Sequence, residues 1–494
     1  LTFDGGTLRL TASSSAYLGG LTSATIRSGG VTFDTNGNNI TVSQALLTNA
    51  TSTGGGLTKN GTGTLTLSGA NTYTGTTAIN SGTLQIGAGS TTGNLSSSSS
   101  ITNNGTLAFN RTDTLTQGTD FGTTISGTGN LIQAGTGTTI LSGANTYAGS
   151  TTISAGTLQM AHASALGSGG NITFSGGALQ YGSGITTDIS SRIKNSGSAI
   201  VVDTSSNNVT FSSNLGSTNS GGLTKNGSGT LILGTDNTYS GTTTVNAGTL
   251  QLTGNISSSA LTIGNGGIVS IGTAAAVAKY NASSLTLQGG SGLAITLASA
   301  SGTTAGTDFD QLTATGALTL SNTAASPFTV YLNGTPTGWS NSGTYSWDII
   351  SAASQTGFTA GNFSVNVNSF GIASANRTGT WSFSNPSGGT IRLTYAAAAG
   401  GDSIWAGTTG VWSGNFSPGV STDKNITFTG SGGVATNDIA SGTLSSVNFI
   451  TFNSTAGAYT LNATTGAAGL AGGTALTVKG DILNNSANAT GQTI

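Results

Sequence analysis

The sequence has no cysteine and no glutamate, and it is poor in charge, proline and histidine. Its 494 residues include 4 prolines, 1 histidine and 14 acidic residues, all of which are aspartate. The absence of cysteine excludes disulfides and thiolate metal sites. Charged residues make up 5% of the chain, against roughly 25% in ordinary soluble domains. Solubility must therefore come from serine, threonine and asparagine, which favours strands and turns over helices.

Other absences exclude whole classes of partner. The net charge is -2, and no basic patch could neutralise a row of phosphates, so we expect no nucleic acid partner. No run of about eighteen apolar residues occurs, so no membrane span is predicted in this chain. Residues 1–15 lack the charged start and apolar core of a signal peptide. If the protein is secreted, we therefore expect this chain to be a mature or internal segment of a longer product.

Glycine, by contrast, is abundant, and it belongs to a repeat. There are 81 glycines. The phrase "GGGLTKNGTGTLTLSGANTYTGTTAINSGTLQI" at 54–86 returns in related form at 125–160 and at 221–252. Tyr73, Tyr147 and Tyr239 hold one position in the three copies. A repeat of this kind fixes the architecture before any single residue is interpreted.

Within the repeats, apolar residues alternate with a period of two. In "GTLTL" Leu65 and Leu67 share one face, and Thr64 and Thr66 share the other. Such a strand recurs about every twenty residues, which fits one coil of a parallel β-helix. The regular alternation argues against disorder, and a hairpin barrel remains the alternative fold. About twenty-two residues per coil would give roughly eighteen coils over residues 1–395, stacked about 4.8 Å apart.

The predicted fold class is all-β: a right-handed parallel β-helix (solenoid) over 1–292, then an aromatic-rich terminal β module over 293–395. That module holds Trp339, Trp347 and Trp381, and we expect it to cap the exposed strand edge of the solenoid. Residues 396–401 are predicted to form a linker. Residues 402–494 are predicted to begin a further β-helical segment, which could complete a neighbouring subunit or a tandem repeat.

The phrases "LTKNGTGTLTLSGANTYTGTT" and "AGTLQ" closely resemble the autotransporter-associated β-strand repeat, also called the passenger-associated transport repeat. "ALGSGGNITFSGGALQY" at 165–181 is similar to the linking sequence of such proteins. "GTDFDQLTATGALTL" at 306–320 resembles their terminal region, and "WAGTTGVW" at 405–412 resembles the beginning of another passenger. The resemblance implies a secreted parallel β-helix displayed on a bacterial surface, and it does not imply one activity.

Ionisable residues are few, and their spacing suggests no catalytic group. His162 is expected in a turn. Asp308 and Asp310 are spaced i, i+2 on one strand face, as paired carboxylates would be, although solubility of an edge strand explains them better. The triplet "RIK" at 192–194 resembles one that binds substrate carboxylates in β-helical pectin hydrolases, but their other elements are missing. We therefore expect Arg192 and Lys194 to be a solvated charge pair at a strand end.

The sequence offers one candidate calcium site and two lysines that could lie at strand edges. "DTNGNN" at 34–39 could offer oxygen ligands to calcium, but an Asx turn is the better account. Lys59 and Lys225, both in "LTKNG", are predicted to be charged gatekeepers on a strand edge. No catalytic, cofactor-binding or metal-binding residue is predicted.

The leading functional prediction is therefore a non-enzymatic structural subunit of an extracellular filament or surface layer. A passenger-like beginning at 402–494 follows a passenger-like ending at 293–395, so head-to-tail self-association would form an open fibre. The alternative is a surface adhesin passenger that binds host cells or polysaccharide. A β-helical carbohydrate-active enzyme is the third and weakest hypothesis.

Overall fold

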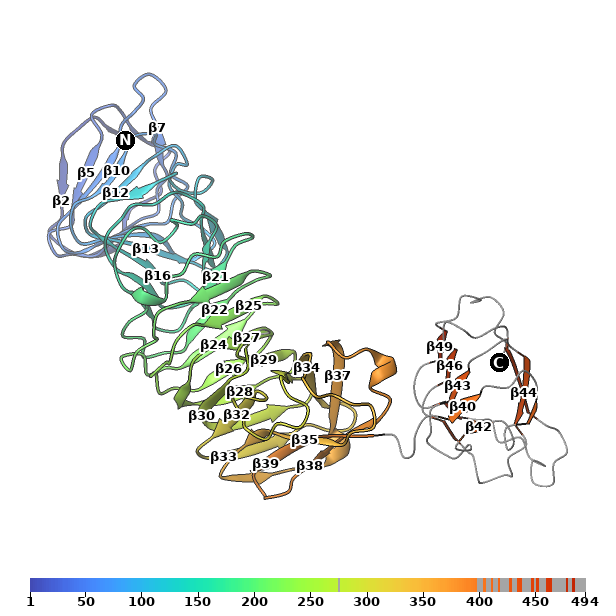
Figure 1. Ribbon diagram of the computed structural model, residues 1–494. Helices are drawn as coiled ribbons and strands as arrows, with labels where there is room; N and C mark the ends of the chain where they lie inside the picture. The colour runs from blue at the N-terminus through green and yellow to red at the C-terminus, as the bar shows by residue number, and fades with distance from the viewer. Residues whose placement is uncertain are drawn as a thin grey trace. The chain divides into compact units, whose positions relative to one another are not determined.

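The computed structural model describes residues 1–273 and 276–397, and beyond them only the backbone of strands β40 to β49. The described chain is all-β apart from the short 3₁₀ turns η1 (Ser190–Arg192), η2 (Ala360–Asn362) and η3 (Ser374–Asn376). It divides into two compact units with interleaved ranges (Figure 1). Unit 1 comprises 1–295, 310–331 and 351–364, and unit 2 comprises 296–309, 332–350 and 365–494.

Unit 1 is a solenoid of strands that pair in parallel with the strands one coil before and after. The first sheet runs through β2 (Thr7–Arg9), β5 (Val31–Asp34), β8 (Leu57–Asn60), β10 (Thr77–Ile79), β12 (Ile101–Asn103) and β15 (Ile125–Ser126). The second sheet runs through β3 (Ser14–Leu18), β6 (Ile40–Val42), β9 (Thr64–Leu67), β11 (Thr83–Ser90), β13 (Thr106–Arg111), β16 (Asn130–Gln133), β18 (Thr151–Ile153) and β20 (Ile172–Phe174).

Further sheets continue the coils. The third sheet, within unit 1, runs through β14 (Thr114–Thr116), β17 (Thr138–Leu141), β19 (Thr157–Met160), β21 (Ala178–Tyr181), β22 (Ile200–Asp203), β24 (Leu223–Asn226), β26 (Thr243–Val245), β28 (Ile256–Ile263), β30 (Lys279–Gln288) and β32 (Gln311–Ala314), with β33 (Ala317–Ser321) beside β30 and β36 (Ser354–Thr356) beside β33. The fourth begins with β23 (Asn208–Phe211), β25 (Thr230–Leu233), β27 (Gly248–Leu252), β29 (Gly267–Ile271) and β31 (Gly292–Thr296). The fifth comprises β1 (Thr2–Phe3), β4 (Ala24–Ile26) and β7 (Leu46–Thr48).

These sheets confirm the all-β fold and the parallel solenoid. The solenoid has about 13 turns, fewer than the roughly eighteen expected from coil length, because that estimate counted residues 293–395 as coils. The alternation of faces is also confirmed. Leu65, Leu84, Leu107 and Leu131 are fully buried and lie in register on successive coils. Each contributes about 1.5–3 kcal/mol by burial.

Each copy of the repeat occupies two successive coils. In the first copy β8 and β9 form one coil, and β10 and β11 form the next, with Thr77 beside Leu57 and Thr83 beside Thr64. Equivalent strands of the three copies do not lie in the same sheet of the solenoid. The opening strands β16 and β18 of the second copy lie in the second sheet, which carries the closing strands of the first copy. The third copy is displaced in the same way, since β24 and β26 follow β17 and β19 in the third sheet.

Unit 2 contains β35 (Tyr345–Ser351) except its last residue, then β39 (Thr390–Ala396) and β38 (Thr380–Ser384), in this order, with β38 and β39 antiparallel. Strands β34 (Phe328–Gly334) and β37 (Phe363–Phe370) have residues in both units. The aromatic residues of unit 2 cluster around Trp339, as described below. The division expected at residue 292 and the capping role of the aromatic module remain predictions.

Most of residues 398–494 lies outside the described residues, and so do most of the expected linker and most of the expected further segment. The described strands there are β40 (Ser403–Trp405), β41 (Gly410–Val411), β42 (Phe416–Ser417), β43 (Ile426–Phe428), β44 (Gly433–Asn437), β45 (Ser446–Val447), β46 (Ile450–Phe452), β47 (Tyr459–Ala463), β48 (Thr477–Val478) and β49 (Ile482–Asn484). Strands β40, β43, β46 and β49 pair in parallel. In the described part of the chain, no helix has the length and apolarity needed to cross a membrane.

Candidate functional site

His162, Asp308 and Asp310 each accept a hydrogen bond from a backbone N–H group. His162 lies at a bend, where its Nδ1 accepts a hydrogen bond from the N–H of Ser164 at 3.0 Å. Asp308 accepts from the N–H of Thr304 at 2.9 Å in unit 2. Asp310 is buried in unit 1 and accepts from the N–H of Ala278. The two aspartates thus belong to different units, and each secures a local turn or strand end.

The Asx turn predicted at 34–39 is present. The N–H of Asn36 donates to Oδ1 of Asp34 at 3.0 Å, and Asn36 has a positive φ of 49°. The related sequence "VDTSSNN" forms the same turn, in which the N–H of Ser205 donates to Oδ1 of Asp203 at 2.7 Å. The aspartate therefore stabilises a left-handed corner residue without glycine. Within the described residues, no group of three or more histidines and acidic residues is placed to hold a metal ion.

The prediction of a solvated pair at Arg192 and Lys194 is wrong for Arg192. Its guanidinium is half-buried and donates to three carbonyl oxygens of the preceding coil, those of Leu166 (2.8 Å), Gly167 (3.3 Å) and Gly170 (2.8 Å). A chain turning a corner leaves such carbonyls without a strand partner. Arg192 therefore holds two coils together. The side chain of Lys194, by contrast, forms no hydrogen bond within the described residues.

The prediction that Lys59 and Lys225 are gatekeepers on an edge is also wrong. Both are fully buried. The ammonium group of Lys59 donates to the carbonyls of Asn60 (2.9 Å), Gly61 (2.8 Å) and Ser81 (3.1 Å) and to Oγ1 of Thr35 (2.8 Å). That of Lys225 donates to the carbonyls of Asn226 (2.9 Å), Gly227 (2.8 Å) and Ala247 (3.1 Å). Each lysine fills the inside of a corner and donates to the carbonyls that converge there, of which those of Asn60 and Asn226 also accept from the N–H groups of Thr35 and Thr204.

The second copy fills the same corner with glutamine. Gln133 is buried, and its Nε2 donates to the carbonyls of Gly135 at 2.9 Å and Gly137 at 3.2 Å. Its Oε1 has no hydrogen-bond partner among the residues that the structure describes. The amide of Gln133 therefore donates to corner carbonyls as the lysine ammonium groups do. It also brings an acceptor oxygen into a corner where the backbone presents only carbonyls.

The tyrosines shared by the three copies lie inside the solenoid. Tyr73 is fully buried, and its hydroxyl lies 2.7 Å from Oγ1 of Thr77, which lies 3.1 Å from Oγ of Ser99. The same hydroxyl pair recurs at Tyr147 with Thr151 (2.8 Å) and at Tyr239 with Thr243 (2.6 Å). These residues are structural, since hydroxyls buried in this way must be hydrogen-bonded to one another.

The buried corner lysines predict an unusual pH dependence of stability. Burial lowers the pKa of Lys59 and of Lys225 from 10.5 to about 8. Between pH 8 and pH 10 the unfolded chain therefore holds two protons that the folded chain has released, so the free energy of unfolding rises with pH. We expect a gain of roughly 1–3 kcal/mol per lysine over this interval. Above pH 10 the trend reverses, because burial raises the pKa of Tyr73, Tyr147 and Tyr239, and only the unfolded chain ionises them.

Urea unfolding followed by circular dichroism at pH 7.5, 8.5, 9.5 and 10.5 measures this profile. The double variant Lys59→Met/Lys225→Met serves as the control and should lose the rise. A wild-type profile that is flat or falling between pH 8 and pH 10 would show that both lysines keep their ordinary pKa.

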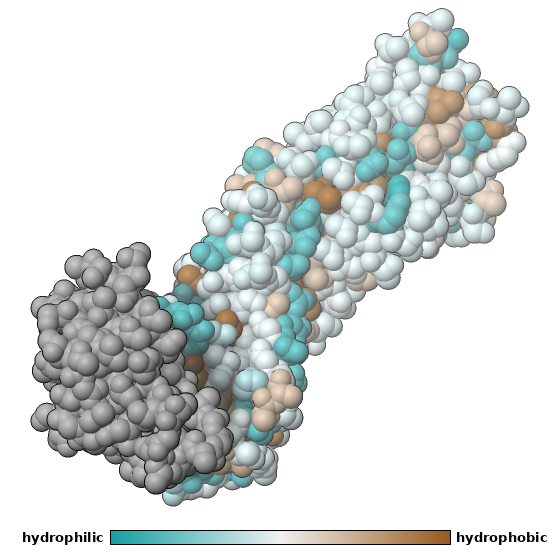
Figure 2. Space-filling view, turned by 90° about the vertical axis from the view of Figure 1, so that its right-hand side faces the viewer, coloured by the Kyte–Doolittle hydropathy of each residue, from teal (hydrophilic) through white to brown (hydrophobic). Residues whose placement is uncertain are grey.

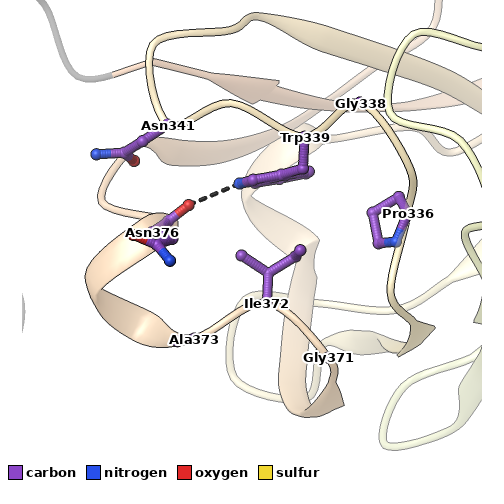
Figure 3. Close-up of a pocket in the computed structure, with 8 residues that line it drawn as sticks. All are labelled: Pro336, Gly338, Trp339, Asn341, Gly371, Ile372, Ala373 and Asn376. Carbon is purple, nitrogen blue, oxygen red and sulfur yellow. Dashed lines mark hydrogen bonds between the residues drawn. The ribbon is translucent and has the colours of Figure 1, made fainter.

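The one wide concave site among the described pockets lies in unit 2 (Figure 3). It is an open cleft of about 540 Å³. Its walls are two loops, one between β34 and β35 and the other between β37 and β38. The lining residues are Pro336, Gly338, Trp339, Asn341, Gly371, Ile372, Ala373 and Asn376. None of these eight side chains carries a charge.

Trp339 forms one side of this cleft and packs against four other aromatic rings. Its ring centroid lies 4.6 Å from that of Tyr395, 5.1 Å from Tyr345, 5.4 Å from Phe370 and 6.1 Å from Trp381. Its Nε1 donates to the carbonyl of Asn376 at 2.6 Å. Figure 3 shows Ile372 pointing toward the indole from the opposite loop. The indole is therefore fixed in orientation while it remains half-exposed.

Hydrogen bonds also tie the two loops together. Oδ1 of Asn341 accepts from the N–H and the hydroxyl of Thr378 at 3.0 and 2.9 Å and from the hydroxyl of Tyr395 at 3.0 Å. Gly371 lies against the side chain of Thr335, where a Cβ would collide. The cleft is therefore preformed. Sequence reasoning missed it, because the tryptophans indicated an aromatic module but not which loops would leave a ring open to solvent.

Comparison with known proteins agrees with the repeat and the fold. The family Passenger-associated-transport-repeat matches three segments, 57–86, 131–160 and 223–252. The chain is also 33% identical over 279 residues to the Adhesin BmaC autotransporter of Brucella suis biovar 1 (strain 1330). That alignment covers 46% of this chain and 8% of the relative, so this chain spans a small part of that protein's length.

The matched segments begin at the opening strand of each copy, β8, β16 and β24, and end with its closing strand, β11, β19 and β27. They therefore coincide with the two-coil blocks of the solenoid. Together the repeat family and the relative indicate a secreted protein of the bacterial surface. The chain thus carries three passenger-associated transport repeats on a β-solenoid and is similar to a part of an autotransporter adhesin.

Proposed function

We propose that this chain is part of the passenger of a surface adhesin, and that it acts by binding rather than by catalysis. The observation that carries the proposal is the alignment of 279 residues with an autotransporter adhesin, at 33% identity. In unit 1 the charged side chains that sequence reasoning singled out bind backbone groups of their own coils, as Lys59, Arg192 and Lys225 do. Such a solenoid offers a scaffold for display.

The solenoid supplies length and stiffness. Thirteen coils at the spacing of neighbouring strands give a rod on the order of 60 Å. Its surface has intermediate hydropathy over much of the face in Figure 2, as expected where serine, threonine and glycine predominate. A neutral rod of this kind places a binding site at a distance from the cell without attracting charged material from solution. The filament hypothesis stays a prediction, and it rests on residues 402–494, most of which lie outside the described part.

Display of this chain on a non-adherent bacterium tests the adhesin proposal. The chain would be fused to a heterologous outer-membrane anchor, and attachment would be counted on cultured epithelial cells and on polysaccharide-coated plates. We expect attachment several-fold above that of cells displaying an unrelated β-solenoid of equal length, with equal surface amounts verified by antibody labelling. Attachment equal to that control on every surface would contradict the proposal. Fibres formed by the purified chain in electron micrographs would favour the filament instead.

A further inference from the structure

We propose that the cleft of unit 2 is a binding site for an uncharged glycan chain, with Trp339 as the stacking platform. This inference rests on the adhesin function proposed above and names the site and the chemical class of the ligand. The uncharged cleft, the fixed indole and the amide side chains at its rim carry the inference together.

The indole provides the apolar part of the site. A pyranose ring has a face of C–H groups that packs on an aromatic ring, and the partly exposed indole of Trp339 offers a rigid surface for it. The rings of Tyr345, Phe370, Trp381 and Tyr395 packed around the indole restrict its rotation. Binding therefore costs little additional side-chain entropy. Ile372 bounds the space opposite the indole (Figure 3).

The rim of the cleft carries amide groups that can hydrogen-bond to sugar hydroxyl groups. Because Oδ1 of Asn341 accepts from Thr378 and Tyr395, the amide is held in one orientation. Its Nδ2 forms no hydrogen bond within the described residues and remains available to a ligand oxygen. The side chain of Asn376 is exposed at the opposite edge and also forms no hydrogen bond there. Amides both donate and accept, as hydroxyl groups of a sugar require.

The uncharged lining and the volume of the cleft further restrict the class of ligand. With no charged lining residue, the cleft offers nothing to the carboxylates or sulfates of acidic glycans, whose desolvation would be uncompensated. The volume of about 540 Å³ falls within the range of sites that hold small ligands. The cleft is open, so a longer chain can extend beyond it. An uncharged oligosaccharide segment fits these conditions, because its hydroxyl groups donate and accept as the rim amides do.

The test uses the purified chain and two arginine substitutions. Ala373→Arg places a long charged side chain in the cleft, at a residue with φ of -59° and ψ of 147° that any residue adopts. Ser382→Arg, on the exposed face of β38, adds the same charge elsewhere. Calorimetric titration would use uncharged tetrasaccharides of glucose, galactose, mannose and N-acetylglucosamine, with polygalacturonate and heparin as acidic probes.

We expect at least one uncharged tetrasaccharide to bind, Ala373→Arg to weaken it by about tenfold or more, and Ser382→Arg to leave it within about twofold. Trp339→Phe should weaken binding less than Ala373→Arg while the near-ultraviolet circular dichroism of the cluster persists. Binding that Ala373→Arg does not affect, a preference for the acidic probes, or no binding to any uncharged probe would each overturn the inference.

The same variants separate this inference from the adhesin proposal. If the displayed chain attaches to cells and Ala373→Arg attaches equally well, the glycan cleft is refuted and the adhesin function stands. If the displayed chain attaches to nothing although the purified chain binds a tetrasaccharide through the cleft, the adhesin function is refuted and the binding site stands.

Discussion

Replacement of Gly82 by valine should unfold the solenoid around the first repeat, with a loss of about 4 kcal/mol or more in the free energy of unfolding. Gly82 has a φ of +67°, which a β-branched residue rarely adopts. A Cβ at this position would collide with the carbonyls of Gly61 and Gly63 and would lie 2.7 Å from the ammonium nitrogen of Lys59. The two carbonyls are backbone atoms of the preceding coil and cannot move without breaking its ladder.

Gly184 supplies the matched control. It has a φ of +75°, yet a Cβ there would meet nothing within 4 Å. Gly184→Val should therefore cost only the backbone strain, about 1–2 kcal/mol. Urea unfolding monitored by circular dichroism compares the two variants. Equal losses would show that backbone strain alone sets the cost, and that the close approach of coils at Gly82 contributes nothing.

Replacement of Lys59 by methionine is expected to cost about 3 kcal/mol at pH 7. The methionine fills a similar volume but removes the ammonium donor from the hydroxyl of Thr35 and from three carbonyls, of which that of Asn60 keeps the N–H of Thr35 and that of Gly61 keeps the hydroxyl of Ser81. Lys59→Gln should cost less, about 1–2 kcal/mol, because Gln133 performs the same task in the second copy.

Lys194→Met removes the same charge from a half-buried lysine whose ammonium group has no hydrogen-bond partner in the described part of the chain. It should change stability by less than about 0.5 kcal/mol. Thermal unfolding of the three variants ranks them. If Lys59→Met proved as mild as Lys194→Met, water would have to reach the corner and satisfy the carbonyls.

The fold was predictable because its cause is local and repeated. The phrase "GTLTL" determines which residues face inward, and its recurrence about every twenty residues determines that coils stack. Lys59 was placed wrongly because a general rule about charge at strand edges was preferred to the period of two. Leu57 and Lys59 lie two residues apart and share one face, so the alternation itself indicated that the lysine points inward. No sequence pattern shows which carbonyls the lysine meets there, since these belong to the corner that follows Lys59 and to the next coil.

The cleft and the placement of the copies depend on geometry that the repeat does not encode. The sequence predicted an aromatic module from Trp339, Trp347 and Trp381. It could not show that two loops meet at Trp339 and leave the indole partly exposed, because that outcome depends on contacts such as Asn341 with Thr378. The displacement of the copies depends on the lengths of the intervening segments, which vary.

The displacement of the copies has a consequence for how such a chain grows in evolution. Since the opening strands of one copy continue the sheet of the closing strands of the copy before it, a duplicated block need not be inserted as a whole number of turns. One sheet of the solenoid accepts both the opening strands and the closing strands of a copy. Unequal recombination between copies can therefore lengthen or shorten the gene at many points without breaking the core. A solenoid built in this way tolerates rapid variation in length, and an antibody raised against one copy would meet its epitope again on a different side.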